Sequence, residues 1–297
     1  MVTENTARQL DELKPHNEFF IGVDSDGCAF DTMEIKHKEC FCPQYIGHFG
    51  LQAVSKYARE TWEFVNLYSK TRGLNRFLAL IRSLDMLRNR EEVAARGIEV
   101  PALRAVREWA ERETRLGNPA LEAEVRKNPD KDLNCALAWT TEVNDDIRKL
   151  VHGIPPFPGV RKSLKMMQAR CDTIVVSQTP CEALNREWAE HDIDQFVRMI
   201  AGQEMGSKAE HIALAAKGKY PAEKIMMIGD APGDLKAAKA NEALFYPIVP
   251  GAEEASWKRL HEEALENFFA GKYAGEYEKM LIDEFNACLP EKAPWEK

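Results

Sequence analysis

The sequence has no long apolar run. Nowhere does it hold the roughly 18 consecutive apolar side chains that a membrane-spanning helix needs. Residues Met1–Asn5 also lack the basic start and following apolar stretch that are typical of a secretory signal. These absences argue against a membrane protein and against a secreted one, and we expect a cytoplasmic protein with no membrane partner.

Paired cysteines and an excess of positive charge are absent as well. The seven cysteines are scattered and odd in number, with no Cys-x-x-Cys pair and no histidine at zinc-ligand spacing. We therefore expect reduced thiols and no zinc. The net charge of −8 argues against a nucleic-acid partner, because binding to a phosphate backbone depends on basic surface.

What the sequence does contain is a short apolar run that ends in acids. Residues 19–23, FFIGV, precede Asp24 and Asp26, and Gly27 follows directly. Such a run is typical of a parallel strand covered on both faces, and carboxylates two residues apart project to the same side as the strand ends. Two like charges are costly to bury side by side, so we expect a divalent cation and a lysine near them.

The periodicity of the apolar residues changes twice along the chain. From about residue 34 to 151 these residues recur every three or four positions, as in amphipathic helices. After the proline-rich segment 154–159, helices alternate with strands expected near 172–177, 196–200, 224–229 and 243–249. From residue 253 onward the pattern is helical again.

This organisation predicts an α/β protein with a doubly wound parallel sheet. We expect residues 1–33 and 152–250 to form the α/β core, and residues 34–151 to form an all-helical cap domain. Residues 251–297 are expected to form a helical C-terminal extension that packs on the core or the cap.

Polar residues follow three of the expected strands. In an open parallel sheet, functional groups gather outside the carboxyl ends of the strands. The candidates are Asp24 and Asp26, then Ser177, Gln178 and Thr179, then Asp230 and Asp234, together with Lys208 at the start of an intervening helix. Together they offer an acidic nucleophile, a phosphate cradle, a metal anchor and a cation.

These residues resemble four ordered motifs of the haloacid dehalogenase superfamily, in its phosphatase branch. Asp-x-Asp-Gly-x-x-x-Asp begins at Asp24, a hydrophobic strand ends at Ser177, Lys208 follows, and Gly-Asp-x-x-x-Asp begins at Gly229. Each motif is weak alone, but four in order are specific. The resemblance covers residues 19–33 and 154–249, and it implies a Rossmann-like core with a helical cap inserted after the first motif.

The two acids of the first motif are expected to differ in their roles. Asp24 would attack phosphorus and form an aspartyl-phosphate, and Asp26 would act as general acid and then general base. We expect Mg²⁺ to be held by Asp24, the Asp26 carbonyl and Asp230, with Asp234 orienting the metal site.

The remaining candidates would bind the phosphoryl group and the rest of the substrate. Ser177, with the amide of Gln178 and with Thr179, would hold phosphoryl oxygens, and Lys208 would neutralise charge in the transition state. The segment 70–90 carries six basic residues and one acid, and we expect Arg72 or Arg76 to bind a second anionic group of the substrate. The alternative is a solvated basic face.

Individual residues also have plainer interpretations. The Asp-x-Asp-Gly segment could be an Asx turn or a calcium loop, and Asp234 could be a helix cap. Ser177 could simply end a strand, and Lys208 could be a solvated helix residue. Four motifs at suitable spacing favour catalysis, and Asp31 is expected to fix the loop that leads into the cap.

The predicted function is a Mg²⁺-dependent phosphohydrolase that cleaves a small phosphate monoester, so the expected partner is a small phosphorylated metabolite. Asp26 argues against dehalogenases and phosphonoacetaldehyde hydrolases, because by resemblance both lack an acid at this position. A phosphomutase of the β-phosphoglucomutase kind and a catalytically idle binding protein on the same fold are the alternatives. The residues do not identify the ester or the oligomeric state.

Overall fold

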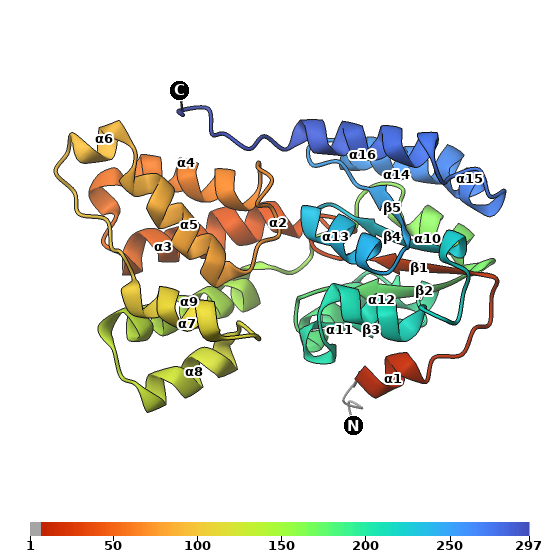
Figure 1. Ribbon diagram of the computed structural model, residues 1–297, viewed down its shortest axis with the longest axis horizontal. Coiled ribbons are helices and arrows are strands. Elements are labelled where there is room, and N and C mark those ends of the chain that lie inside the picture. The colour runs from red at the N-terminus through yellow and green to blue at the C-terminus, as the bar shows by residue number, and fades with distance from the viewer. Residues whose placement is uncertain (1–6, 297) are drawn as a thin grey trace. The chain divides into compact units, whose positions relative to one another are not determined.

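The computed structural model describes residues 7–296 and divides into two compact units (Figure 1). The first, which we call the core unit, comprises Met1–Thr32 and Gly153–Pro290. The second, the cap unit, comprises Met33–His152 and Glu291–Lys297. The boundary after Thr32 lies next to Asp31, the residue expected to fix the loop into the cap.

The core unit is built on a parallel sheet of five strands in the order β3-β2-β1-β4-β5. The strands are β1 (Phe19–Val23), β2 (Cys171–Val176), β3 (Met199–Ala201), β4 (Ile225–Gly229) and β5 (Leu244–Pro247). All five residues of β1 are buried, as expected for an apolar strand at the centre of a sheet. The predicted doubly wound α/β fold is confirmed.

The third strand is shorter than its apolar pattern predicts. Asp194–Phe196 forms a 3-10 turn, and pairing with β2 covers only Met199–Ala201. Because β3 is an edge strand, it has one neighbour and needs no long ladder.

Helices cover both faces of the sheet. On the face that receives Phe19, Ile21 and Val23 lie α10 (Val160–Gln168), α11 (Cys181–Glu190), α14 (Glu253–Arg259), a π-helical turn (Leu260–Ala264) and α15 (Leu265–Phe269). On the face that receives Phe20 lie α1 (Ala7–Asp11), α12 (Lys208–Ala215) and α13 (Pro232–Ala240). Short 3-10 turns at Gln203–Met205 and Ala222–Lys224 connect these elements.

The helix α16 (Glu276–Cys288) covers the β5 edge of the sheet. The Phe245 amide donates to Glu278 Oε1 at 2.9 Å, and the Tyr273 hydroxyl donates to the Phe245 carbonyl at 2.6 Å. Unpaired backbone groups on an edge strand are a template for aggregation, so these bonds protect the sheet. Most of the C-terminal extension is therefore part of the core unit.

The cap unit is helical throughout its ordered elements. They are α2 (Thr32–Ile35), which begins at the last residue of the core unit, a π-helical segment (Lys36–Phe41), α3 (Cys42–His48), a 3-10 turn (Gln52–Val54), α4 (Ser55–Asn66), α5 (Arg76–Arg88), α6 (Glu91–Ala94), α7 (Arg104–Arg112), α8 (Asn118–Lys127) and α9 (Lys131–Leu150). Trp62 and Trp139 meet edge to face at its centre, with ring centroids 5.9 Å apart, and both are fully buried. These tryptophans pack the cap core.

The last residues that the structure describes pack within the cap unit. Trp295 meets Phe64 edge to face with ring centroids 5.5 Å apart, and the Arg90 guanidinium lies 4.3 Å from the Trp295 ring centre. Lys70 and Glu291 form an ion pair at 2.9 Å. The C-terminal extension thus divides between the two units. Among the described residues, no helix is long and apolar enough to cross a membrane.

Candidate active site

The candidate nucleophile lies where β1 ends. The Asp24 amide donates to the Ile228 carbonyl at 2.9 Å, which extends the ladder with β4 by one residue and leaves Asp24 only 4% exposed. Gly27 has φ +75°, a conformation that side chains disfavour, so the chain turns directly after Asp26. An apolar strand followed by this turn therefore buries Asp24 at the carboxyl end of the sheet.

Lys208 joins two of the candidate acids. From the first turn of α12, its Nζ donates to Asp24 Oδ2 at 2.5 Å and to Asp234 Oδ1 at 2.6 Å. Burial alone would lower the pKa of Lys208, but the charges of Asp234 and Asp24 outweigh it and raise that pKa above its ordinary value. Lys208 is therefore a fixed positive charge beside the candidate nucleophile.

Asp234 approaches the end of β4 closely because Gly229 has no side chain. A Cβ on Gly229 would lie 2.4 Å from Asp234 Cβ, far inside contact distance. Asp234 Oδ2 accepts from the Ala231 amide at 3.1 Å, while its other oxygen accepts from Lys208. Both oxygens of Asp234 are engaged, which suits the orienting role expected for it.

Asp24, Asp230 and Asp234 each offer a carboxylate oxygen, and these atoms lie within 4.8 Å of one another. All three residues are buried, and burial raises the pKa of Asp24 well above its usual range, with the charges of Asp234 and Asp230 adding to the effect and Lys208 opposing it. Clustered carboxylate oxygens are the ligands that Mg²⁺ prefers, and a divalent cation would relieve their repulsion. The residues present fit a magnesium ion.

Asp26 lies apart from this cluster and is held by two hydroxyl groups. Thr179 Oγ1 donates to Asp26 Oδ2 at 2.7 Å, and the Thr32 hydroxyl donates to Asp26 Oδ1. Thr179, expected to bind substrate, thus orients Asp26. Thr32 was not among the predicted site residues, and its place directly after Asp31 at a helix start was the available signal.

The predicted phosphate cradle follows β2. The register Val23↔Val175 places Ser177 beside the loop that follows β1, and Ser177 is 2% exposed. Its Oγ accepts from the Thr179 amide at 3.2 Å, and Gln178 Nε2 donates to the Gly206 carbonyl at 2.9 Å. These bonds hold the loop between β2 and α11 and join Gln178 to Gly206, two residues before Lys208.

The two arginines expected to bind an anion lie inside the cap unit. Arg72 is 5% exposed, and its Nη1 donates to the Leu67 carbonyl at 3.0 Å. Arg76 Nη1 donates to Thr140 Oγ1 at 2.9 Å and to Asn144 Oδ1 at 2.7 Å. Within residues 7–296, Arg76 forms no ion pair, and burial lowers its pKa to about 10.

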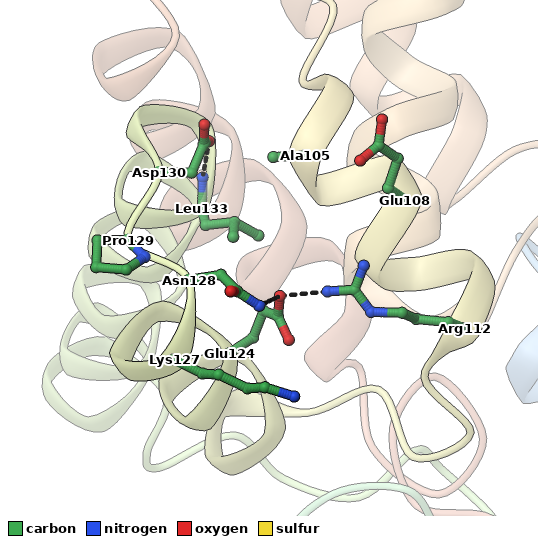
Figure 2. A pocket seen from close by; sticks show the side chains of 9 residues that line it. All are labelled: Ala105, Glu108, Arg112, Glu124, Lys127, Asn128, Pro129, Asp130 and Leu133. Carbon is green, nitrogen blue, oxygen red and sulfur yellow. Dashed lines mark hydrogen bonds and ion pairs between the residues drawn. The ribbon is translucent and has the colours of Figure 1, made fainter.

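A cavity of about 400 Å³ lies elsewhere in the cap unit, among α7, α8 and the start of α9 (Figure 2). Its lining residues are Ala105, Glu108, Arg112, Glu124, Lys127, Asn128, Pro129, Asp130 and Leu133. Arg112 is paired with Glu124, and Asp130 caps α9 by accepting from the Asp132 amide at 2.7 Å. Because none of the predicted site residues lines this cavity, we do not assign the chemistry to it.

His211 makes the stability of the core unit dependent on pH. This residue of α12 is fully buried, and burial together with the charge of Lys208 lowers its pKa from 6.5 to about 4. As the pH falls from 6.5 to 4, His211 binds a proton in the unfolded chain but not in the folded chain, so the free energy of unfolding decreases across this window. Wild type should lose up to about 3 kcal/mol more than His211→Gln over this range.

Urea unfolding at several pH values measures this difference. The exposed His152 provides the control, because His152→Gln should follow the wild type. Parallel pH profiles for wild type and His211→Gln would contradict the prediction.

The family model described as haloacid dehalogenase-like hydrolase matches residues 44–241, more than half of the chain. The match includes Ser177, Lys208 and Asp230 but not β1, and the first acid motif is placed at the site by the sheet register and by the bond from Lys208 to Asp24. A comparison with curated proteins found no match.

Several solved structures match this chain at low sequence identity. A putative phosphoglycolate phosphatase from Lactobacillus delbrueckii is 16% identical, with 83% of this chain and 92% of that chain covered and a TM-score of 0.48. A putative beta-phosphoglucomutase from Thermotoga maritima is 16% identical, with 77% of this chain and 84% of that chain covered and a TM-score of 0.38. A haloacid dehalogenase-like family protein from Streptococcus pneumoniae is 14% identical, with 81% of this chain and 90% of that chain covered and a TM-score of 0.43.

All three TM-scores are below 0.5, so these matches establish neither a shared fold nor a shared activity. The family model, by contrast, spans most of the cap and three of the four site motifs. This chain belongs to the family of haloacid dehalogenase-like hydrolases.

Proposed function

We propose that this hydrolase is a Mg²⁺-dependent phosphatase of a small phosphate monoester that works through an aspartyl-phosphate on Asp24. The observation that supports this proposal is that the two acids of one turn have different surroundings. Asp24 is buried with Lys208 and two further carboxylates, whereas Asp26 accepts from the hydroxyl groups of Thr179 and Thr32. Asp24 is thus placed beside positive charge, and Asp26 is placed to give up and take up a proton.

Asp24 would act as the nucleophile. One carboxylate oxygen attacks phosphorus, the bond from phosphorus to the ester oxygen breaks, and the phosphoryl group is carried by Asp24. The Ser25 amide donates to Asp24 Oδ1 at 2.8 Å and Lys208 to Oδ2, so the carboxylate is oriented before the substrate arrives. A preoriented nucleophile lowers the entropic part of the barrier.

Asp26 would move the proton in both half-reactions. It gives its proton to the leaving ester oxygen, and later takes a proton from the water that attacks the phosphoryl group on Asp24. That second displacement releases inorganic phosphate and restores Asp24. The hydroxyls of Thr179 and Thr32 fix the direction in which the Asp26 carboxyl points.

Lys208 and Ser177 would stabilise the transferring group. The lysine charge is locked between Asp24 and Asp234, so no reorganisation is needed when negative charge spreads over the phosphoryl oxygens. Asp24, the Asp26 carbonyl and Asp230 would hold Mg²⁺, with Asp234 orienting the metal site. When bound, this ion offsets the repulsion between Asp24 and an anionic substrate.

A phosphate-release screen tests the proposal. Wild-type protein would be assayed with Mg²⁺ and with excess EDTA against sugar phosphates, nucleotides, phosphoglycolate and pyrophosphate. We expect release that requires Mg²⁺ from at least one monoester. A bisphosphate activator that yields an isomerised product in place of inorganic phosphate would favour a mutase, and no turnover on any compound would favour a binding protein.

Arg76 is the stronger of the two candidates in the cap for an anion of the substrate. Among the described residues, its charge is met only by the neutral side chains of Thr140 and Asn144 and by the ring of Phe41, 5.0 Å from the guanidinium carbon. A partly buried cation without an acidic partner gains by binding an anion.

Arg76→Met should therefore raise the Michaelis constant about tenfold for esters that carry a second anionic group, consistent with a lost charge-assisted hydrogen bond. The Michaelis constant for p-nitrophenyl phosphate should stay near the wild-type value. Arg88→Met is the matched control, since Arg88 is paired with Asp85 at 2.7 Å. An equal change for both substrate types would exclude Arg76 from substrate binding.

A further inference from the structure

Ser25 stands between the two acids of the first motif, and its side chain points to a different partner from theirs. It is fully buried. Trp188 Nε1 donates to Ser25 Oγ at 2.9 Å, and Ser25 Oγ donates to Glu187 Oε2 at 3.1 Å. The directions are fixed by chemistry: an indole N–H only donates, so the serine oxygen accepts from it and sends its single proton to the glutamate.

The backbone of Ser25 is engaged as fully as its side chain. Its amide donates to Asp24 Oδ1 at 2.8 Å. Its carbonyl accepts from the Ala29 amide at 2.9 Å and the Phe30 amide at 3.1 Å, which closes the turn after Asp26. A shift of the Ser25 side chain would therefore move the peptide that orients one acid and the turn that carries the other.

Helix α11 contacts the turn from a second direction. The loop that leads into α11 supplies Thr179, whose hydroxyl donates to Asp26. Near the other end of the helix, the fully buried Trp188 ring meets Phe30 edge to face, with ring centroids 5.8 Å apart. Helix α11 and the loop that leads into it thus touch the motif at Asp26, at Ser25 and at Phe30.

We propose that Ser25, Trp188 and Glu187 form a brace that positions Asp24 and Asp26 relative to each other for phosphoryl transfer. They are positioning residues, since the bonds that define the brace join them to each other. The inference rests on the proposed phosphatase function. Its physical basis is that misplacement of catalytic groups by about 1 Å costs on the order of 100-fold in rate.

The test compares Ser25→Ala, Trp188→Phe and the double variant, with p-nitrophenyl phosphate and saturating Mg²⁺. Each single variant should lower kcat about tenfold, well within the range that misplacement produces, and should change KM less than about twofold. The double variant should be no slower than the slower single variant, because either change breaks the same chain of hydrogen bonds.

Glu187 supplies a rescue that a purely structural role would not produce. Glu187→Gln keeps an acceptor oxygen for Ser25 and should retain wild-type kcat, whereas Glu187→Ala should match Ser25→Ala. Because Glu187 is only partly buried, both variants should fold even where a change at Ser25 prevents folding. Ser163→Ala is the matched control, a buried serine of α10 that takes no part in the brace.

Three results would overturn the brace: wild-type kcat in Ser25→Ala and in Glu187→Ala, additive losses in the double variant, or a lowered melting temperature with unchanged kcat. An active wild type with any of these leaves the proposed function standing. Absence of metal-dependent turnover in the wild type overturns the phosphatase function itself, and with it the reaction that the brace would serve.

Discussion

Asp24→Asn is expected to abolish metal-dependent phosphate release, with kcat lowered by at least about 1,000-fold. The amide has nearly the shape of the carboxylate but cannot attack phosphorus, and it offers no negative charge to a metal ion. Because Asp24 is buried beside Asp230 and Asp234, removal of its charge lessens repulsion, so the variant should stay folded. Lost activity would then report on chemistry and not on stability.

Three measurements check this expectation. Phosphate release is followed for wild type and variant under saturating Mg²⁺, and circular dichroism confirms that the variant is folded. A covalent phosphoryl group trapped on the wild type by acid quenching should be missing from Asp24→Asn. A variant that turns over at the wild-type rate would place the nucleophile elsewhere and end the aspartyl-phosphate mechanism.

Lys208→Met should affect both activity and stability. The substitution removes one preorganised positive charge from beside the transferring phosphoryl group, which lowers kcat about 100- to 1,000-fold. It also leaves Asp24 and Asp234, both buried, without the ion pairs now at 2.5 and 2.6 Å. Breaking a buried pair from one side costs about 3 kcal/mol or more, so the metal-free variant should melt well below the wild type.

Mg²⁺ should restore part of that lost stability, because a cation bound by the same carboxylates replaces some of the missing charge. The rise in melting temperature on adding Mg²⁺ should therefore be larger for Lys208→Met than for the wild type. Lys217→Met, at an exposed lysine just after α12, is the control and should match the wild type in both assays. Wild-type kcat in Lys208→Met would remove this residue from the site.

Local pattern was enough to predict the sheet and where its polar ends would lie. Apolar runs such as residues 19–23 are readable because a central parallel strand must be buried on both faces, whatever it packs against. The strand ends then had to meet at one edge, which brought Asp24, Lys208 and Asp234 into contact. Chain order and strand burial alone therefore imply that these three residues lie close together.

The partners of individual side chains did not follow from local pattern. Thr32 and Thr179 both hold Asp26, yet the second lies 153 residues from it, and Trp188 reaches Ser25 over 163 residues. A hydroxyl or an indole carries no periodic signal, since its partner depends on which helix the fold places alongside. For the same reason, the sequence did not predict the hydrogen bonds between β5 and the side chains of Glu278 and Tyr273.

The sequence by itself therefore determined the α/β core, the inserted helical cap and the cluster of acids and lysine at the strand ends, because burial and strand direction impose them locally. Only the tertiary structure decided how Asp26 is held, that α16 covers the sheet edge, and that Trp295 packs in the cap unit. These depend on contacts between distant segments, whose choice rests on shape and on unpaired polar groups that no single segment reveals.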